Sequence, residues 1–175
     1  MLIALTGTPG TGKSTIASDL RERGLRVVEV SDLAKEHGML GEMDVDRNSY
    51  NVDVGELKAA AISLRGEGVV ILVGHLAHLV GPEVAIVLRC RPSVLGKRLA
   101  SRGWSDRKVR ENIEAEAVDA VLIESLSTAG KVYEIDTTDR PRKDIVDAVL
   151  SIINGITDKY APGNIDWSDE VLKWY

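Results

Sequence analysis

Residues 7–14 carry the pattern best suited to chemistry, because they read GTPGTGKS and directly follow the apolar run Leu2 to Leu5. They match the phosphate-binding loop pattern G-x-x-x-x-G-K-S/T, in which glycines let backbone N–H groups curl around an anion. Lys13 supplies a cation for the β- and γ-phosphates, and the Ser14 hydroxyl is a ligand for Mg²⁺. An amphipathic helical pattern follows, which a bare glycine-rich turn would not require. The segment therefore predicts a site for a nucleoside triphosphate with Mg²⁺.

Length, composition and charge set the broad class. The 175 residues, of which 44% are hydrophobic, suffice for one compact domain without disulfide bonds. The formal net charge of -5 argues against a protein that coats nucleic acid through general positive charge. The single cysteine, Cys90, is expected to be a buried structural thiol rather than a nucleophile. With no membrane-length apolar stretch and no basic leader, we expect a soluble, cytoplasmic protein that does not enter a membrane.

Short β-branched runs alternate with helical stretches, which is the pattern of a parallel sheet joined by crossover helices. The expected strands cover 2–6, 26–30, 69–73, 84–88 and 132–135. The expected helices lie near 13–23, 32–37, 54–66, 92–102, 106–127 and 141–154. Fully apolar strands need helices on both faces of the sheet. Together with the phosphate loop, this predicts the α/β three-layer fold of P-loop NTPases.

Two further segments deserve interpretation. The irregular stretch 38–51 lies between the second and third strands and indicates an inserted, movable subdomain. The segment 89–110 is mostly basic and surrounds a Gly-Trp turn at 103–104. Such a charge run is usually a solvated helical face. Beside a triphosphate site it predicts instead a lid that closes arginines over phosphates, with these basic residues: Arg89, Arg91, Lys97, Arg98, Arg102, Arg107, Lys108 and Arg110.

Several stretches together resemble one family. They are the phosphate loop, S-D-L at 31–33, G-H-L-A-H-L at 74–79 and, above all, VLGKRLASRGWSDRKVRENIEAE at 94–116. They are similar to the archaeal and eukaryotic nuclear type of adenylate kinase, a nucleoside monophosphate kinase family also described as ribosome-maturation ATPases. The tail segment 165–168 looks like the archaeal branch. The similarity extends over nearly the whole chain and is most specific in the 94–116 segment.

The resemblance implies an architecture and an activity. It implies a single kinase domain over 1–175, with a monophosphate-binding insertion at about 30–53, a short lid at about 101–111 and a C-terminal tail at about 156–175. It implies transfer of the terminal phosphate of ATP to AMP or other nucleoside monophosphates, with Mg²⁺, and also ATPase activity. Family members act late in maturation of the small (30S) ribosomal subunit, where they bind the universal small-subunit ribosomal protein eleven and pre-30S particles.

The resemblance also assigns site residues. Those expected to bind ATP are Gly10, Gly12, Lys13, Ser14, Thr15, Arg98 and Arg102. Lys13, Arg102 and His75 would be catalytic, with His75 orienting a water or the γ-phosphate from just past a strand's end. Arg98 precedes Arg102 by one helical turn, so both can address the nucleotide, although an exposed helix charge explains Arg98 equally well.

Other assignments have simpler alternatives. Asp53 and Glu56 lie where the monophosphate base or ribose would sit, but a solvated helix start explains both. Thr137 and Thr138 follow the last strand, where related kinases contact adenine through the backbone, and threonine is also a routine turn residue. His78 is expected to pack or cap. A metal pair between His75 and His78 is not expected, because no carboxylate or cysteine lies nearby in the sequence.

One position departs from the family pattern. The related proteins commonly carry an aspartate where Val73 stands, and that aspartate anchors waters of the Mg²⁺ shell. Valine cannot do so. Asp32, in the S-D-L segment, is the candidate substitute through a water, although it would also suit the start of a helix.

Alternative functions follow from this departure. The first is a nucleoside monophosphate kinase favouring AMP. The second is a ribosome-assembly ATPase or binding factor whose kinase activity is weak or incidental. Val73 favours the second, because weaker magnesium anchorage should cost turnover more than binding, and the acidic segment 29–56 would suit a basic partner or simply be solvated. Shikimate kinases share the loop and sheet, but they do not account for residues 94–116.

Overall fold

The computed structural model describes residues 1–44, 49–66 and 68–174, and its centre is a five-stranded sheet. The strand order is β2-β5-β1-β6-β7, and neighbouring strands are parallel. The strands are β1 (Leu2–Thr6), β2 (Arg26–Glu29), β5 (Val70–Val73), β6 (Val84–Arg89) and β7 (Lys131–Asp136). Because β1 is central, the phosphate loop leaves the middle of the sheet. The predicted α/β fold is confirmed.

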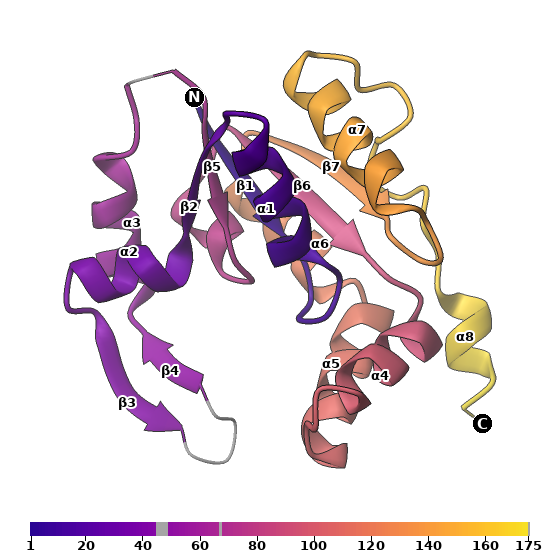
Figure 1. Cartoon of the computed structure of the whole chain (residues 1–175). Helices are drawn as coiled ribbons and strands as arrows, with labels where there is room; N and C mark the ends of the chain where they lie inside the picture. Colours follow the sequence, from indigo (N-terminus) through magenta and orange to yellow (C-terminus); the bar gives the residue numbers. More distant parts are fainter. Residues whose placement is uncertain (45–48, 67, 175) are drawn as a thin grey trace.

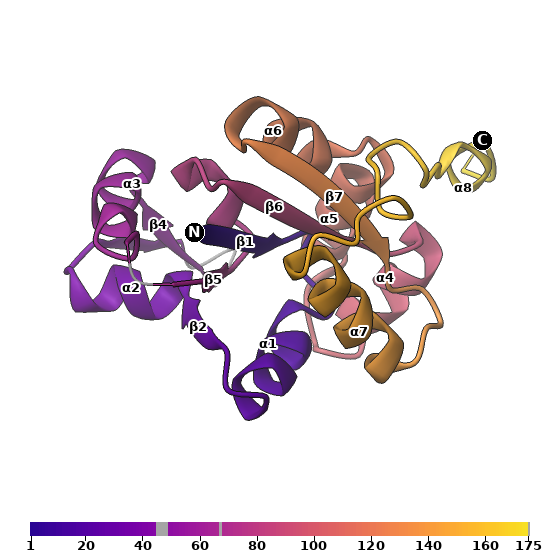
Figure 2. The same ribbon diagram turned by 90° about the horizontal axis from the view of Figure 1, so that it is seen from above.

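Helices cover both faces of the sheet (Figure 2). One face carries α1 (Lys13–Glu22) and α7 (Arg142–Ile153), which pack on Ile3 and Leu5 of β1. The other face carries α3 (Val54–Ile62), the 3-10 helix η1 (Ala77–Val80) and α6 (Ala120–Thr128), which pack on Leu2 and Ala4. Successive strand side chains point to opposite faces, so the uninterrupted apolar strands serve both layers.

Two helical arms extend beyond the carboxyl ends of the strands, on either side of the loop that precedes α1 (Figure 1). One arm contains α2 (Val30–Glu36) and an antiparallel pair, β3 (Leu40–Asp44) and β4 (Ser49–Val52). The other contains α4 (Pro92–Ala100) and α5 (Asp106–Ala117). The described part of the irregular 38–51 segment is thus largely a hairpin, while residues 45–48 lie outside the described part.

The prediction of one helix over 106–127 is wrong. The chain turns at Val118 and Asp119, where Asp119 adopts a left-handed φ of 58°, and α6 begins at Ala120. The turn brings the Asp119 carboxylate onto the guanidinium of Arg89. The local sequence keeps its helical periodicity through this turn. The break cannot be predicted from it, because the turn is stabilised by Arg89 of a strand distant in the sequence. The short helix α8 (Ser168–Leu172) was also not predicted.

Arg89 does not belong to a lid, which corrects the reading of the basic segment. Its side chain is 1% exposed, and it donates from Nε to Glu116 Oε1 at 2.8 Å and from Nη1 to Glu134 Oε2 at 2.9 Å. Asp119 pairs with Nη2, and the Trp167 ring centroid lies 5.9 Å from Cζ. We call these five residues the Arg89 network. A guanidinium this deeply buried requires carboxylates around it, because an unpaired buried charge is very unfavourable.

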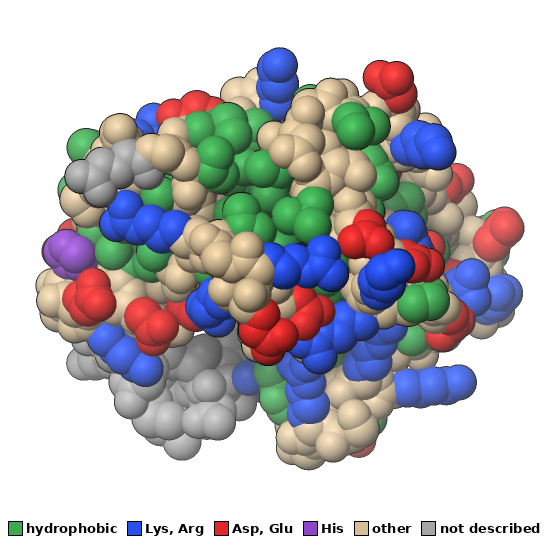
Figure 3. Space-filling model, turned by 45° about the horizontal axis from the view of Figure 1, so that its top comes forward, with side chains coloured by type: hydrophobic (Ala, Val, Ile, Leu, Met, Phe, Trp, Pro, Cys, Tyr) green, Lys and Arg blue, Asp and Glu red, His purple; other side chains and the backbone are tan. Residues whose placement is uncertain are grey.

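The rest of the basic segment lies largely at the surface. On the face of the molecule that Figure 3 shows, Lys and Arg side chains gather on the side of α4 and α5, with carboxylates interspersed. Two of the arginines form helical ion pairs, Arg107 with Glu111 at 3.9 Å and Arg110 with Glu114 at 3.6 Å. Among the residues that the structure describes, none of the helices combines the length and apolarity needed to span a bilayer.

Candidate active site

The phosphate loop is shaped by glycines that have different reasons to be glycine. Gly12 caps α1 with φ 104°, a left-handed conformation that residues with a Cβ rarely adopt. A Cβ on Gly7 would lie 2.3 Å from the carbonyl oxygen of Leu88, so β6 itself excludes a side chain there. The first turn of α1 therefore points its free N–H groups at the loop, which favours binding of an anion.

Lys13 crosses the loop from the start of α1. Its Nζ donates to the carbonyl oxygens of Gly7 at 2.7 Å and Thr8 at 3.0 Å. Burial lowers the pKa of Lys13 to about 8, and the charge of Arg102 acts in the same direction, while Glu116 and Glu29 oppose it. Lys13 thus remains a cation at neutral pH, but it is poorly solvated. Its charged form is stabilised when phosphate oxygens replace the two carbonyl oxygens as hydrogen-bond acceptors.

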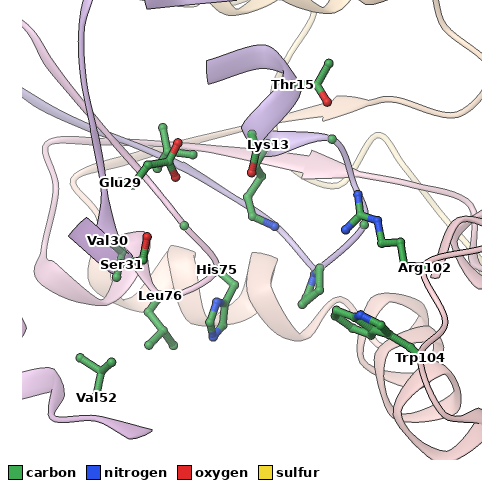
Figure 4. Close-up of a pocket in the computed structure, with 16 residues that line it drawn as sticks. Lys13, Thr15, Glu29, Val30, Ser31, Val52, His75, Leu76, Arg102 and Trp104 are labelled. Carbon is green, nitrogen blue, oxygen red and sulfur yellow. The ribbon is translucent and has the colours of Figure 1, made fainter. Parts of the chain in front are cut away.

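A cavity of about 340 Å³ brings several predicted residues together. Lys13, Ser14 and Thr15 come from the loop and α1, His75 follows β5, and Arg102 follows α4. In Figure 4, His75 and Lys13 lie side by side, while Arg102 and Trp104 stand on the opposite side of Lys13 from Glu29. The three residues predicted to be catalytic therefore share one cavity.

The His75 side chain is accessible from this cavity, and protein atoms pack around the rest of it. Loss of solvation, together with the nearby charges of Lys13 and Lys108, lowers the pKa of His75 to about 4. The imidazole is therefore neutral at physiological pH. A neutral imidazole has one nitrogen that accepts a hydrogen bond, so His75 can hold a water molecule or a protonated phosphate oxygen.

His78 has a structural position, as predicted. It is 1% exposed, with Nδ1 2.9 Å from Thr6 Oγ1 and Nε2 2.9 Å from Glu124 Oε2. Cys90 is buried, as predicted, and burial raises the pKa of its thiol to about 11.

A second cavity of about 330 Å³ lies on the other side of the phosphate loop. Its wall includes Arg98, Thr137 and Arg142, and it shares Gly10, Gly12, Thr15 and Arg102 with the first cavity. Arg98 is half-buried and donates from Nη2 to the carbonyl oxygen of Thr137 at 3.0 Å, so it is not a freely exposed helix charge. Thr138 is turned away, with its hydroxyl accepting from the Arg91 N–H at 2.8 Å.

The predicted lid region begins as a tight turn. Residues 101–105 connect α4 to α5, and Ser105 caps α5 by accepting from the Lys108 N–H at 3.4 Å. The Lys108 ammonium lies 3.9 Å from the centroid of the Trp104 ring, a cation–π contact that fixes the tryptophan against the cavity. Arg102 is exposed at the tip of this turn and reaches both cavities.

Three predicted residues do not line the cavities. Asp32 is exposed on α2, and Glu56 is exposed on α3. Asp53 is the N-cap of α3, with Oδ1 accepting from the Glu56 N–H at 2.9 Å, which is the helix-start alternative. Sequence reasoning missed Glu29, which lines the first cavity. The available signal was its place at the end of a parallel strand, where α/β proteins bind ligands.

The donor atoms in the first cavity fit Mg²⁺ bound to a nucleotide. Among the described residues, no three His, Cys, Asp or Glu side chains come together as a metal cluster. The Ser14 hydroxyl is exposed in the first turn of α1, and the Glu29 carboxylate lines the same cavity. Mg²⁺ requires few protein ligands of this kind, because it keeps several waters and takes the rest from phosphates.

Comparisons with solved structures support the fold. Shikimate kinase from Acinetobacter baumannii in complex with shikimate matches with a TM-score of 0.61 at 14% identity, covering 88% of this chain and 93% of that chain. Shikimate kinase from Bacteroides thetaiotaomicron matches with a TM-score of 0.59 at 17% identity, covering 88% and 98% respectively. The similarity concerns the arrangement of sheet and helices.

Sequence comparisons reach further. A family model described as "AAA domain" matches residues 3–119. A protein of Archaeoglobus fulgidus named "Putative adenylate kinase" is 49% identical over 174 residues, covering 98% of this chain and 94% of that protein. A protein of the same name from Methanocaldococcus jannaschii is 42% identical over 176 residues, covering 99% and 97%. The chain therefore belongs to this family of archaeal adenylate kinase-like proteins, and the matched residues 3–119 include the phosphate loop and the turn that carries Arg102.

Proposed function

We propose that this protein is a nucleoside monophosphate kinase that transfers the terminal phosphate of ATP to AMP or another nucleoside monophosphate. One observation carries the proposal: two cavities of about 340 Å³ and 330 Å³ meet at the phosphate loop. Phosphoryl transfer requires donor and acceptor to be held in line on two sides of the transferred group.

Each cavity suits one substrate. The second cavity, between Arg98, Thr137 and Arg142, would receive the base and ribose of ATP, with its phosphates in the loop. The first cavity would receive the monophosphate, since its wall includes Val30 and Val52 from the arm predicted to bind it. Asp53 and Glu56 lie just after this wall and remain predicted contacts for the monophosphate.

In the reaction, an oxygen of the monophosphate attacks the γ-phosphorus, and the bond from that phosphorus to the ADP oxygen breaks, leaving ADP and a nucleoside diphosphate. Lys13 and Arg102 approach the cavity as cations and would take up the charge that spreads over the transferred group. Mg²⁺, held through the Ser14 hydroxyl, would neutralise the β- and γ-phosphate oxygens. Trp104 would help to exclude water when the turn closes.

A second candidate activity is ATP hydrolysis. His75 favours it, because a neutral imidazole exposed to the cavity can orient a water molecule toward the γ-phosphate. A role for this ATPase in late maturation of the small ribosomal subunit, with ribosomal protein eleven and pre-30S particles as partners, rests on the resemblance of residues 94–116.

The decisive assay separates the two products. ATP is incubated with Mg²⁺ and each nucleoside monophosphate in turn, or with none, while nucleotides and inorganic phosphate are quantified together. A kinase converts ATP and AMP into ADP with little phosphate released. If AMP leaves ATP consumption unchanged and every turnover releases phosphate, the kinase proposal is wrong and the hydrolase is favoured.

A further inference from the structure

The end of β5 lacks a carboxylate at the place where a P-loop enzyme normally has one. P-loop NTPases hold Mg²⁺ with the loop Ser or Thr and an aspartate at the end of a strand beside the loop. Here β5, next to β1, ends in Val73, which is 1% exposed and belongs to the apolar core. A carboxylate from another element is therefore needed if the cation is to be anchored from this side.

Glu29 is the one acidic side chain among the described residues that line the first cavity. It ends β2, and its Cα partner in the sheet is Val73, whose own partner is Leu5 of β1. Residues in register across parallel strands point to the same face of the sheet. The Glu29 carboxylate consequently lies on the face that carries α1, the helix whose first turn presents Ser14.

A contact confirms this orientation. Arg21, on the α1 face, donates from Nη2 to Glu29 Oε1 at 2.9 Å. Glu29 also contributes to the electrostatics of Lys13, because its negative charge raises the pKa of that lysine. The carboxylate therefore faces the space between the strand ends and the phosphate loop, as Figure 4 shows.

Glu29 and Ser14 line the same cavity, so an anchoring contact through water requires no change in the fold. Neighbouring strands lie about 4.8 Å apart, so Glu29 starts one strand further from β1 than Val73. Glutamate is one methylene longer than aspartate, and Mg²⁺ usually keeps waters that bridge the remaining distance. The side chains of Arg21 and Glu29 are 42% and 22% exposed, and a partly solvated pair of this kind contributes little stability, so the carboxylate can leave it.

We propose that Glu29 anchors the hydrated Mg²⁺ of the bound nucleotide, opposite Ser14, and replaces the carboxylate that Val73 does not provide. This inference rests on the proposed nucleotide site but not on which acceptor receives the phosphate. It also assigns the role to Glu29 instead of Asp32, since the Asp32 side chain is exposed on α2 and outside the cavity lining.

The test measures metal binding without turnover. Mn²⁺ is titrated into the protein saturated with a non-hydrolysable ATP analogue, and free Mn²⁺ is followed by electron paramagnetic resonance. Glu29→Gln should weaken Mn²⁺ binding by roughly tenfold to a hundredfold, the range for losing an outer-shell partner of a metal. Binding of the analogue in EDTA should stay the same or become tighter, because a negative charge has been removed from the cavity.

Two variants separate anchoring from structural effects. Arg21→Gln breaks the same ion pair but keeps the carboxylate, so Mn²⁺ binding should be unchanged or tighter. Adding Val73→Asp to Glu29→Gln should restore Mn²⁺ affinity, because the new carboxylate stands beside β1 in the same register.

Contrary results are equally clear. The proposal is overturned if Glu29→Gln leaves Mn²⁺ affinity unchanged, if Arg21→Gln weakens it equally, or if Asp32→Asn removes it while Glu29→Gln does not. If the parent protein binds the ATP analogue neither in EDTA nor with excess Mn²⁺, the nucleotide site itself is wrong. Failure to phosphorylate AMP would instead overturn only the proposed kinase reaction.

Discussion

The Arg89 network and the first cavity both hold a positive charge that is partly or wholly removed from bulk water, Arg89 in one and Lys13 in the other, but their surroundings differ. In the network, three carboxylates surround Arg89, and Glu134 Oε1 also accepts the N–H groups of Gly163, Asn164 and Ile165 at 2.8–3.0 Å. In the cavity, neither Lys13 nor Arg102 forms an ion pair with a residue that the structure describes. The Arg89 network supplies its own counter-ions from the protein, whereas the cations of the cavity would be paired by a bound ligand.

One small domain thus combines a rigid, fully paired region with a region prepared for an anionic ligand. Buried charges that are fully paired fix their surroundings, whereas a desolvated cation without an ion-pair partner, such as Lys13, is unfavourable until an anion binds. The two regions touch at Glu116. Its Oε2 accepts from the Thr8 hydroxyl of the phosphate loop at 2.5 Å, and its Oε1 accepts from Trp167 Nε1 of the tail at 3.2 Å. The closed network thus supports the loop that must stay open to phosphate.

Removing the central cation of the Arg89 network should change the protein most. Arg89→Met should lower the free energy of unfolding by about 5 kcal/mol, because it leaves Glu116 and Glu134 buried without their cation. Urea denaturation followed by circular dichroism measures the loss. Arg91→Met, at the exposed neighbouring position, should change stability by less than about 0.5 kcal/mol. A variant at Arg89 as stable as the parent would show that the network does not hold the fold.

Removing a cation from the cavity should lower activity strongly and leave the free energy of unfolding almost unaffected. Lys13→Met is expected to reduce ATP turnover by on the order of a thousandfold, since a charge-stabilising group is lost. Its free energy of unfolding should stay the same or rise, because a desolvated lysine has been removed. Steady-state assays and urea denaturation give the two values, with exposed Lys97→Met as the matched control. Turnover within tenfold of the parent would contradict the assignment.

Arg102 should show a smaller effect of the same kind. Arg102→Ala is expected to lower the transfer rate by about a hundredfold, in the range for losing one charge-stabilising donor. Because Arg102 is exposed at a turn, the substitution should leave the free energy of unfolding unchanged. Arg107→Ala, also exposed, provides the control. Measuring transfer to AMP and phosphate release in parallel shows whether the lid turn serves transfer selectively, and equal rates for parent and variant would remove Arg102 from the mechanism.

The smallest effect is a pH dependence of ATP binding. Burial lowers the pKa of Lys13 to about 8, and a bound phosphate favours the protonated form, so its pKa rises in the complex. Above about pH 8 the free protein has lost a proton that the complex retains. Affinity should therefore fall by up to about tenfold per pH unit as the pH rises from 8 toward the pKa of the complex. Isothermal titration calorimetry measures the ATP affinity at each pH. If the affinity of the parent protein depends on pH as little as that of Lys13→Met, Lys13 protonation is not linked to ATP binding.

Local patterns were sufficient for the strands and the loop. Apolar runs of the right length predicted all five strands of the main sheet to within one residue at each end. The strands β1, β5 and β6 are buried on both faces, and β2 and β7 keep short β-branched or apolar stretches between charged residues. Periodicity failed at Asp119, since the turn there depends on Arg89, thirty positions away in the sequence. The expected cavity residues Lys13, Ser14, His75 and Arg102 came together, while Asp32, Asp53 and Glu56 did not.

The phosphate loop, the parallel sheet and the basic segment can be predicted from the sequence, because each is encoded by residues close together in the chain. The division of charges between binding and stability depends on the folded arrangement. Arg89 and Arg102 are both arginines of one basic segment, yet the first is enclosed by carboxylates from α5, β7 and the turn before α6, and the second faces a cavity. Likewise, Glu29 became a candidate metal anchor only when strand register placed it beside Val73. The role of a charge depends on its counter-ions, and those come from distant parts of the chain.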